Sequence, residues 1–320
     1  MGIFNHVAGY GGSCWKALGM PWVFYEIIIF GYLIGVSVLL LEWKHKQKHT
    51  HQKKTIFNIL ITVLLVGWIT IFYGSFVEPR LLFVRFQEIL IGQTMNQLHA
   101  VVVSDIHVGP YKQEAWVRHI VEKVNEQDPD VVFLLGDFIF SESSQLRYLA
   151  PLSHLKSRNG VYAVLGNHDF SNNASEEVIE ELKSLGVEVL QNESRLLEDQ
   201  GFLLAGVSDL WFDGDIGETL KFVGETEKPV ILLSHNPDVV LQTDAEKADL
   251  IVSAHTHGGQ IRLPWMGPLL SVPTVLGKAY DRGLFAFNRQ QLFITSGVSE
   301  TGPRARLFTP PEIVNLIIKW

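Results

Sequence analysis

Polar side chains with metal-binding chemistry follow five short apolar runs, each near the point where the run ends. The runs occupy residues 101–103, 131–135, 161–165, 230–233 and 250–252. The polar residues that follow them are Asp105, His107, Asp137, Asn167, His168, Asp169, His235, His255 and His257. Short β-rich apolar runs bounded by Gly or Ser are typical of buried strands. Because ligands gather at strand ends in α/β sheets, we expect these side chains to meet at one sheet edge.

This set holds enough oxygen and nitrogen donors for two adjacent metal ions. Asp105 and His107, two residues apart in one loop, can both reach one metal, and His255 and His257 repeat that spacing. Asp137 directly follows a strand, which suits a rigid bridging carboxylate. Ligands without a thiolate suit Mn²⁺, Fe, Zn²⁺ or Mg²⁺ and disfavour a structural zinc site. We expect two divalent ions, with Mn²⁺ as the first choice, and such a pair favours the hydrolysis of phosphate esters.

The order of the motifs resembles the calcineurin-like metallophosphoesterase superfamily, from about Val101 to the C-terminus. The motifs are Asp-x-His at 105–107, Gly-Asp at 136–137, Gly-Asn-His-Asp at 166–169, the lone His235 and His-x-His at 255–257. Residues 255–261, 296–297 and 310–313 resemble the membrane-attached bacterial branch of that superfamily. The resemblance implies a fold of the α/β class, a four-layer αββα sandwich.

The resemblance also implies a role for each motif residue. The ligands of the first metal would be Asp105, His107, Asp137 and His257, with Asp137 bridging. The second metal would be completed by Asn167, His235 and His255. His168 resembles the acid that protonates the leaving oxygen, a task that suits an imidazole near neutral pH. Asp169 either orients His168 or caps the turn, and Ala254 departs from the Gly that this branch usually has before His-x-His.

Two arginines lie in a Gly/Pro-rich loop after a strand. Arg304 and Arg306 are candidates for substrate binding, because arginine matches the geometry of phosphate well. A salt-bridged surface loop explains the two side chains equally well. The substrate-binding role is therefore one of two open interpretations.

Two apolar stretches precede the motif region. The first, Trp22 to Leu41, is broken only by Glu26, and the second, Ile56 to Val77, carries no charge. Each is long enough to cross a bilayer as a helix, which takes roughly 20 residues, and neither shows a polar stripe. Two very apolar soluble helices are the alternative. The predicted domains are a tail at 1–21, a transmembrane hairpin at 22–77 with a basic loop at 42–55, and a catalytic domain at 78–320.

The charges around the predicted spans indicate an orientation. Residues 44–54 carry five lysines, whereas the tail has only Lys16 and the stretch after the second span has Arg80 and Arg85. Because lysines stay on the cytoplasmic side, the loop is expected to face the cytoplasm. The tail and the catalytic domain would then lie on the outer side of a bacterial inner membrane that the chain crosses more than once.

Composition limits the partners of the chain. Its only cysteine, Cys14, excludes an intrachain disulfide. A net charge of −8 argues against nucleic acid as a partner, because no broad basic surface is available to release counterions. The expected partners are the bilayer and a phospholipid or nucleotide-lipid substrate, and no obligate protein partner is inferred.

Anchoring to a membrane suits a substrate that also resides in the bilayer. Some members of the branch are similar to enzymes of lipid A synthesis that hydrolyse UDP-2,3-diacylglucosamine to lipid X and UMP, which is our leading substrate. That nucleotide-lipid is cytoplasmic, so the substrate and the lysine-based orientation conflict.

Two other functions are weighed against this hypothesis. A phosphoprotein phosphatase would have Asp-Arg-Gly shortly after the bridging aspartate, whereas Asp137 is followed by Phe-Ile-Phe-Ser. A non-catalytic scaffold would have lost metal ligands, whereas every presumed ligand is present.

Overall fold

The structure is a computed structural model that describes residues 21–45, 51–92, 96–198, 201–224 and 228–320. The chain divides into two compact units, with the main boundary between Val77 and Glu78. The smaller unit also includes Gly302–Arg304. Expectations that involve Cys14, Lys16 and the middle of the basic loop fall outside the described residues.

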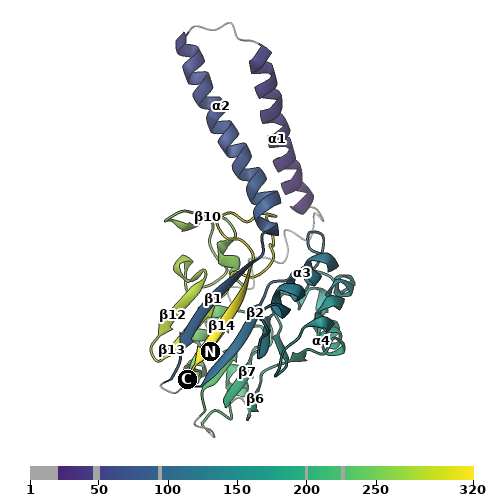
Figure 1. Cartoon of the computed structure of the whole chain (residues 1–320), viewed down its shortest axis with the longest axis vertical. Coiled ribbons are helices and arrows are strands. Elements are labelled where there is room, and N and C mark those ends of the chain that lie inside the picture. Colours follow the sequence, from purple (N-terminus) through teal and green to yellow (C-terminus); the bar gives the residue numbers. More distant parts are fainter. Residues whose placement is uncertain (1–20, 46–50, 93–95, 199–200, 225–227) are drawn as a thin grey trace. The chain divides into compact units, whose positions relative to one another are not determined.

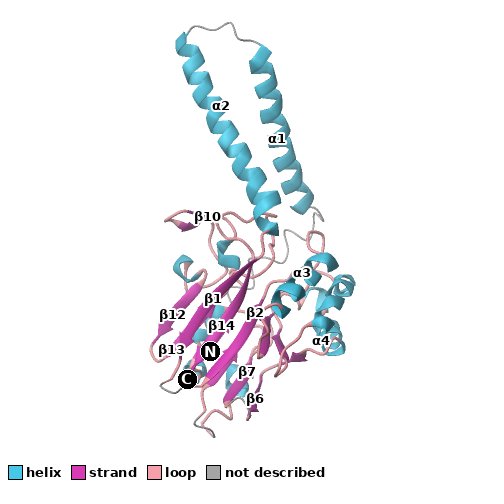
Figure 2. Cartoon of the chain, viewed as in Figure 1, coloured by secondary structure: helices cyan, strands magenta, loops and turns pink. Residues whose placement is uncertain are grey.

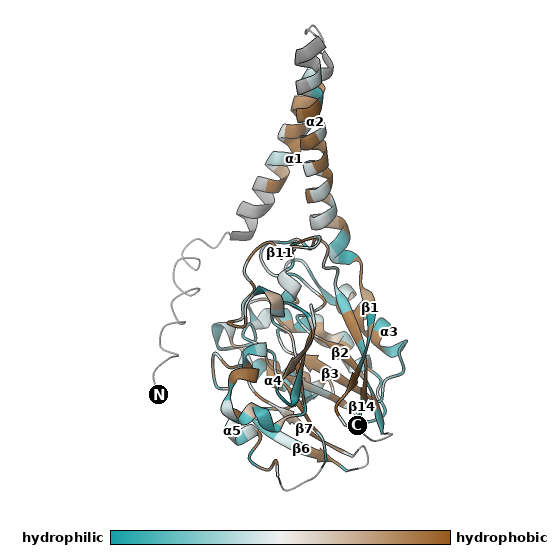
Figure 3. Cartoon of the chain, turned by 90° about the vertical axis from the view of Figure 1, so that its left-hand side faces the viewer, coloured by the Kyte–Doolittle hydropathy of each residue, from teal (hydrophilic) through white to brown (hydrophobic). Residues whose placement is uncertain are grey.

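The smaller unit contains two long helices, α1 (Pro21–His45) and α2 (His51–Phe72), and α2 continues into a π-helical turn at Tyr73–Val77 (Figure 2). Trp68 Nε1 of α2 donates a hydrogen bond to the Leu33 carbonyl of α1 at 3.3 Å. Much of the described surface of both helices is apolar, as Figure 3 shows in brown.

One described helical segment, Asn58–Arg80, is long and apolar enough to cross a membrane. The described apolar part of the first helix, Ile29–Trp43, is shorter. The two-span hairpin therefore stays a prediction.

The larger unit contains two six-stranded mixed sheets (Figures 1 and 2). The first has the order β1-β14-β2-β3-β4-β5. Its strands are β1 (Phe83–Leu90), β14 (Glu312–Lys319), β2 (Gln97–Val103), β3 (Val131–Leu135), β4 (Val161–Val164) and β5 (Glu188–Val189). The C-terminal strand β14 lies between β1 and β2, parallel to β1 and antiparallel to β2.

The second sheet has the order β12-β13-β9-β8-β7-β6. Its strands are β12 (Gly283–Phe287), β13 (Gln290–Ile294), β9 (Leu250–Ser253), β8 (Val230–Leu233), β7 (Phe202–Gly206) and β6 (Glu193–Leu197). A separate antiparallel pair is formed by β10 (Arg262–Leu263) and β11 (Gly267–Pro268).

Alternation along the strands divides the core into three layers. In β3, Phe133 and Leu135 enter a core shared with Leu204 of β7 and Val252 of β9, so the two sheets pack face to face. The intervening Leu134 points to the opposite face, as the period of two requires.

Helices cover the outer faces of both sheets. The elements packed on the first sheet are α3 (Glu114–Asn125), α4 (Ser175–Ser184) and the 3-10 helix η4 (Ser143–His154). Those on the second are α5 (Ile216–Thr219) and the 3-10 helices η6 (Pro237–Leu241) and η7 (Thr243–Lys247). In α3 the buried Val117, Ile120, Val121 and Val124 recur at helical spacing. The α/β class is thus confirmed, and the layers run helix, sheet, sheet, helix.

The five apolar runs all form buried strands. β2, β3 and β4 are mutually parallel in the first sheet, and β8 and β9 are parallel in the second. Parallel strands deliver the loops that follow them to the same edge of a sheet. The polar residues singled out from the sequence lie in those loops.

Candidate metal centre

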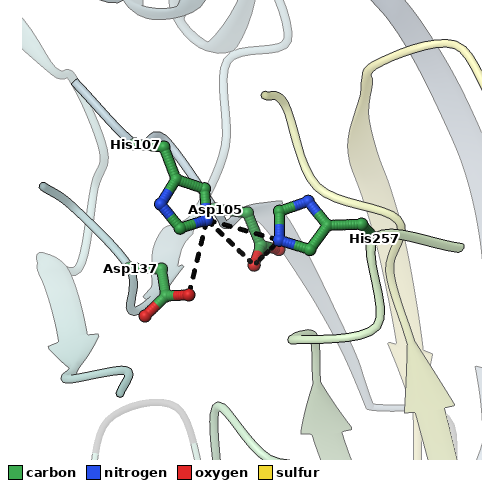
Figure 4. A group of neighbouring side chains, drawn as sticks. All are labelled: Asp105, His107, Asp137 and His257. Atoms are coloured by element: carbon green, nitrogen blue, oxygen red, sulfur yellow. Dashed lines mark hydrogen bonds and ion pairs between the residues drawn. The ribbon is translucent and has the colours of Figure 1, made fainter. Parts of the chain in front are cut away.

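A first group of buried donors joins Asp105, His107, Asp137 and His257 (Figure 4). His107 Nε2 lies 3.4 Å from Asp137 Oδ2 and 3.3 Å from His257 Nε2. Asp105 Oδ1 lies 3.4 Å from His257 Nε2. One ligand atom from each residue lies within 4.8 Å of the others, a spacing at which all four could contact one ion.

A second group joins Asp137 to His235 and His255. Asp137 Oδ2 lies 3.2 Å from His235 Nε2, which in turn lies 3.1 Å from His255 Nδ1. The same carboxylate oxygen therefore faces His107 on one side and His235 on the other. The structure places Asp137 where the sequence analysis expected a bridging ligand.

Several buried oxygens at this edge have no hydrogen-bond partner among the described residues. They include both carboxylate oxygens of Asp105 and the side-chain oxygen of Asn167. Nearly all buried polar atoms in proteins are hydrogen-bonded, so these oxygens need another partner. A divalent cation bound by carboxylate, amide and imidazole donors would satisfy them. The donor set thus fits a pair of metal ions.

Backbone carbonyls orient three of the imidazoles. The Nδ1 atoms of His107, His235 and His257 lie 3.4, 2.7 and 3.2 Å from the carbonyl oxygens of Ile139, Leu135 and Ser299, respectively. A carbonyl can only accept, so the Nδ1 proton is donated to it and Nε2 is left to face the metal centre. Such outer contacts fix the ring orientation and tautomer of metal-binding histidines.

Arg306 supports one of these carbonyls and does not reach the substrate side. The side chain is fully buried, and its guanidinium donates to the carbonyls of Ser296, Ser299 and Thr309. Its N–H groups are thus used inside the loop, which contradicts both the substrate-binding and the surface-loop interpretation. Arg304 is half-buried, with its guanidinium 5.9 Å from the centre of the Phe76 ring. A substrate role for Arg304 stays a prediction.

The ligand loops adopt an unusual backbone conformation. Five of the proposed ligands have positive φ angles, namely Asp105 (55°), His107 (44°), Asp137 (56°), His255 (68°) and His257 (51°). Residues other than Gly rarely adopt this left-handed region, and such strain clusters at functional sites. The surrounding fold must therefore hold these residues against the preference of their backbone for negative φ angles.

Two glycines make the close approach of the β3 and β4 loops possible. A Cβ on Gly136, at φ +78°, would come within 2.3 Å of Gly166 N. A Cβ on Gly166 would come within 2.3 Å of Asp137 Oδ1. Both distances are far too short for nonbonded atoms. Glycine is therefore required at both positions, because any side chain would collide with the neighbouring loop.

Burial and neighbouring charges set the protonation states. Burial lowers the pKa of His107 and His255 well below 6.5 and also lowers the pKa of His257, which keeps these imidazoles neutral and ready to bind metal. Burial alone would raise the pKa of Asp137, but His235 and the other nearby imidazoles hold it well below 3.8. Burial disfavours charged His235, yet the adjacent Asp137 raises its pKa to about 10. Metal binding at His235 must therefore displace a proton.

His168 lies at the open side of this centre. The ring is half-buried, its centre is 4.6 Å from the centre of the His107 ring, and its Nδ1 is 2.6 Å from the Phe140 carbonyl oxygen. The backbone N–H of His168 also donates to Asp137 Oδ1 at 2.8 Å. With Nδ1 engaged, Nε2 is the nitrogen available to a substrate oxygen.

Asp169 caps the neighbouring loops. Its buried carboxylate accepts hydrogen bonds from four backbone N–H groups, those of Asp137, Phe138, Ile139 and Gly166. No hydrogen bond described in the structure joins this carboxylate to the His168 ring. Of the two interpretations of Asp169, the structure therefore favours the cap.

Sequence reasoning missed Asp209 and the aromatic side chains after it. Asp209 is buried, and its Oδ1 accepts from the Trp211 N–H at 2.9 Å. Burial raises the pKa of Asp209 to about 6, and positive charge on His235 opposes the rise. Asp209 follows β7 as Asp105 follows β2, each after a Ser, and this parallel was the available signal.

Half-exposed aromatic rings line one side of the centre. The Trp211 ring meets the His255 ring edge-on, with the two centres 4.8 Å apart. Phe212 stacks on Phe170 with the two ring centres 4.6 Å apart. Trp211, Phe212 and Phe170 are called the aromatic wall below. It offers flat apolar surface next to a proposed metal ligand.

Comparisons with known proteins identify the family. Residues 98–259 match the model of the calcineurin-like phosphoesterase family. A transmembrane protein with metallophosphoesterase domain from Danio rerio is 29% identical over 92% of this chain and 70% of its own length. An uncharacterized metallophosphoesterase of Campylobacter jejuni is 30% identical over 88% of this chain and 75% of its own. The chain belongs to the calcineurin-like phosphoesterase family.

Among solved structures, NAD nucleotidase of Haemophilus influenzae matches with 15% identity and a TM-score of 0.40, over 64% of this chain and 51% of its own. Family membership and the buried cluster of metal ligands together make the protein a metal-dependent hydrolase. The relatives come from a vertebrate and a bacterium, so the bacterial branch stays a prediction.

Proposed function

We propose that the protein is a membrane-anchored phosphoesterase that uses two metal ions to hydrolyse a phosphodiester or pyrophosphate bond of a lipid. One observation carries the two-ion part of this proposal. Asp137 Oδ2 lies 3.4 Å from His107 Nε2 and 3.2 Å from His235 Nε2, so one oxygen belongs to both donor groups. A bridging carboxylate is what a pair of ions 3.5–4 Å apart requires.

Each part of the centre has a distinct task in the proposed reaction. The two bound ions would neutralise phosphoryl oxygens and acidify an attacking water. His168 would give a proton from Nε2 to the leaving oxygen, while the Phe140 carbonyl keeps the ring oriented through Nδ1. Asp169 would keep the bridging carboxylate in place through its hydrogen bonds to the Asp137 and Gly166 backbone.

Mn²⁺ is the proposed metal, with Fe, Zn²⁺ or Mg²⁺ as the other choices. The mixed oxygen and nitrogen donors suit these ions. Metal analysis of the chain purified from cells grown with each metal should find two ions per chain for the native metal. The same analysis addresses the scaffold alternative, because a protein that lost the metal pair would hold fewer than about one ion per chain.

A lipid substrate is supported by the membrane features of the chain. Segment Asn58–Arg80 is apolar enough to span a bilayer, and the Danio rerio relative is named a transmembrane protein. The aromatic wall offers flat apolar surface beside His255 for a base or an acyl chain. Within this class we propose UDP-2,3-diacylglucosamine, cleaved to lipid X and UMP. The proposed location is a bacterial inner membrane.

The phosphoprotein phosphatase alternative has less support. The residue after Asp137 is Phe138, a buried core side chain, and not an arginine that could hold a phosphate. A phosphopeptide therefore serves as the negative control in the experiment that tests the proposal.

That experiment compares three substrates with the purified full chain and Mn²⁺. We expect hydrolysis of soluble bis(p-nitrophenyl) phosphate and of UDP-2,3-diacylglucosamine, but not of a phosphopeptide. Mass spectrometry should detect lipid X and UMP from the nucleotide-lipid. Turnover of the phosphopeptide alone would overturn the proposal of a phosphodiester or pyrophosphate hydrolase, whereas turnover of the diester without UMP release would overturn only the named substrate.

The side of the membrane is tested separately. A C-terminal tag that resists protease in sealed inside-out vesicles would place the catalytic unit outside, as the lysine distribution predicts. Digestion of the tag would place the unit in the cytoplasm, where UDP-2,3-diacylglucosamine resides. The lysine-based orientation and the cytoplasmic substrate exclude each other, so either outcome of this experiment rejects one of the two.

A further inference from the structure

Six large apolar side chains of the catalytic unit are exposed in the β10–β11 hairpin or in segments next to it: Trp265, Met266 and Phe308 line one cavity, and Leu269, Leu270 and Val275 follow the hairpin tip in the chain. We call them the hairpin face: Trp265, Met266, Leu269, Leu270, Val275 and Phe308. Trp265 is fully exposed, and Met266 and Val275 are 78% and 71% exposed. Single exposed apolar residues are ordinary, but a cluster of them marks an interaction surface.

The hairpin of β10 and β11 presents this face. Its turn, Pro264-Trp265-Met266, carries the two most exposed side chains at its tip. Phe308 joins them because the Arg262 N–H donates to the Leu307 carbonyl at 2.9 Å. The chain carries no charge from Leu263 to Gly277. A long uncharged apolar loop at the surface of a chain with net charge −8 is unusual.

Cationic residues border the apolar tip. Arg262, Lys278 and Arg282 line the same cavity of about 620 Å³ as Trp265 and Phe308. Arg262 forms an ion pair with Asp281, the one acidic side chain among the described residues that line this cavity. Arg282 is half-buried and also faces Glu312 and Glu78, so the exposed Lys278 is the cation that the rim presents to solvent. Apolar side chains beside lysine or arginine are the combination that binds anionic bilayers.

One residue of the hairpin face, Phe308, is adjacent in the chain to a contact with the segment that follows the proposed second span. Glu78 follows that apolar stretch directly, and its Oε1 accepts from the backbone N–H of Thr309 at 2.6 Å. Thr309 is the neighbour of Phe308 in the chain. The next residue, Pro79, accepts from Lys112 Nζ through its carbonyl at 2.5 Å. A chain that leaves the bilayer at this segment would bring Phe308 within reach of the bilayer surface.

The hairpin is packed directly against a metal-ligand loop. Gly259 lies two residues after His257, and a Cβ at Gly259 would come within 2.5 Å of Pro268 in β11. Arg262 Nη1 of β10 donates to the Gly258 carbonyl at 3.2 Å. The surface that would touch a membrane is therefore joined to the His257 loop without an intervening layer.

We propose that the hairpin face docks on an anionic lipid bilayer. Trp265 and Met266 enter the boundary between headgroups and acyl chains, and Lys278 contacts the phosphates of anionic headgroups. This second contact holds the catalytic unit against the membrane, so that the metal centre takes its substrate from the plane of the bilayer. The inference rests on the proposed membrane attachment and deepens the proposed function.

The first test places a probe at the tip of the hairpin in the full chain. Cys14 is the only cysteine, so Cys14→Ser allows a single label at Trp265→Cys. The control label is at Leu196→Cys on β6, an exposed position at the opposite end of the catalytic unit from β10 (Figure 1). Both variants carry an environment-sensitive fluorophore and are reconstituted in vesicles of phosphatidylcholine and phosphatidylglycerol.

Docking predicts that the label at 265 shifts its emission to shorter wavelength and is quenched by lipids with a nitroxide on the acyl chain. The label at 196 should show neither change. Replacing phosphatidylglycerol by phosphatidylcholine should reduce the quenching at 265. Equal emission from the two positions overturns the inference. So does shielding at 265 that grows with protein concentration in detergent, because that result assigns the face to a second copy of the chain.

The second test separates docking from chemistry. The double variant Trp265→Ser, Met266→Ser should hydrolyse soluble bis(p-nitrophenyl) phosphate at the wild-type rate. Its hydrolysis of a lipid p-nitrophenyl phosphodiester in the same vesicles should fall by about tenfold or more, as a loss of two interfacial apolar anchors predicts. Equal loss on both substrates overturns docking. Failure of the wild type on the soluble diester would instead reject the proposed function and leave the fluorescence result to judge docking.

Discussion

The ligand loops and the hairpin face depart from ordinary burial in opposite directions. In the ligand loops, carboxylate and amide oxygens of Asp105 and Asn167 are buried without a hydrogen-bond partner among the described residues. On the hairpin face, Trp265 and Met266 are exposed although both are large and apolar. Each arrangement costs free energy in an isolated chain in water. A bound cation would offset the first cost, and the proposed contact with a bilayer would offset the second.

The two regions also differ in rigidity. The bridging Asp137 is held by the buried carboxylate of Asp169, which binds the amides of Asp137 and Gly166. The hairpin is a short two-stranded pair, Arg262 with Pro268 and Leu263 with Gly267, and its Trp265–Met266 tip is exposed. Chemistry needs donors held to a fraction of an ångström, whereas a bilayer accepts an apolar tip in many positions. Substitutions should therefore act through geometry in the first region and through affinity in the second.

Asp137→Asn should have the largest effect of all. The amide keeps the shape of the side chain but loses the charge that both donor groups share, and several kcal/mol of metal stabilisation would be lost. Hydrolysis of the soluble diester should fall by on the order of 10³-fold or more, and bound metal should drop below two ions per chain by elemental mass spectrometry. Asp128→Asn, at an exposed carboxylate paired with Arg158, is the control. Full metal content and activity in Asp137→Asn would show that the Asp137 carboxylate is not needed to bridge two metal ions.

His168→Ala should reduce kcat strongly while both metal ions stay bound. Loss of a positioned general acid costs roughly 10²- to 10⁴-fold. The loss should be much smaller for a p-nitrophenyl ester, whose leaving group needs no proton, than for an alkyl ester. The exposed His154→Ala is the matched control. Equal losses on the two esters would show that His168 does not act as the acid.

Much of the centre could be predicted from the sequence because its geometry follows from local rules. A strand that ends in Gly-Asp or Gly-Asn-His-Asp presents those side chains at the sheet edge, and parallel pairing of β2, β3 and β4 brings three such ends together. The strands themselves were predicted from short apolar runs bounded by Gly or Ser, which are also local features of the sequence. The side chains that a strand presents at its end are thus determined by residues next to that strand in the sequence.

The missed features depend on contacts between distant segments. Arg306 was a candidate for phosphate because its neighbours in the chain are Gly and Pro, but the fold surrounds it with the carbonyls of Ser296, Ser299 and Thr309. The sequence around Trp265 does not distinguish a buried apolar segment from an exposed one, and only the fold shows that these residues are exposed. Burial is a property of the whole molecule, so a motif alone does not decide it.

Lys112 provides a pH test of the contact between the loop that follows His107 and the segment that follows α2, where its Nζ donates to the Pro79 carbonyl. Burial lowers the pKa of Lys112 from 10.5 to about 8, although the nearby Glu300 opposes the shift. Between these values the unfolded chain holds the proton and the folded chain releases it, so this group's contribution to stability rises with pH from about 8 to 10.5. Relative to Lys112→Gln, the unfolding free energy of the wild type should rise by up to about 3 kcal/mol across that window.

Chemical denaturation of the detergent-solubilised chain at pH 8 and pH 10.5 measures this difference. Lys123→Gln is the control, because Lys123 of α3 forms its ion pair with Glu126 at the protein surface. The control should follow the wild type at both pH values. A wild-type advantage that shrinks as the pH rises would contradict a buried, depressed pKa at Lys112.

Arg306→Lys should weaken metal binding without removing a ligand. A lysine keeps the charge but cannot reach the carbonyls of Ser296, Ser299 and Thr309 together, so the Ser299 carbonyl that orients His257 would relax. Outer contacts of this kind contribute about 10- to 100-fold to metal affinity. Mn²⁺ titration followed by electron paramagnetic resonance measures the change, with Arg304→Lys as the control. Unchanged Mn²⁺ affinity would show that Arg306 stabilises its own loop but does not orient His257.

Trp265→Ser should have the smallest effect on the folded protein, and for that reason it completes the contrast with the core. A fully exposed side chain loses almost no packing when it is shortened, so the unfolding free energy in detergent should change by no more than about 0.5 kcal/mol. Phe133→Ala, at an equally apolar but fully buried position between the sheets, should cost about 3–5 kcal/mol in the same measurement. If Trp265→Ser destabilised the chain as much as Phe133→Ala does, the tryptophan would be packed inside the protein in solution, and no side chain would be left at the tip to enter a bilayer.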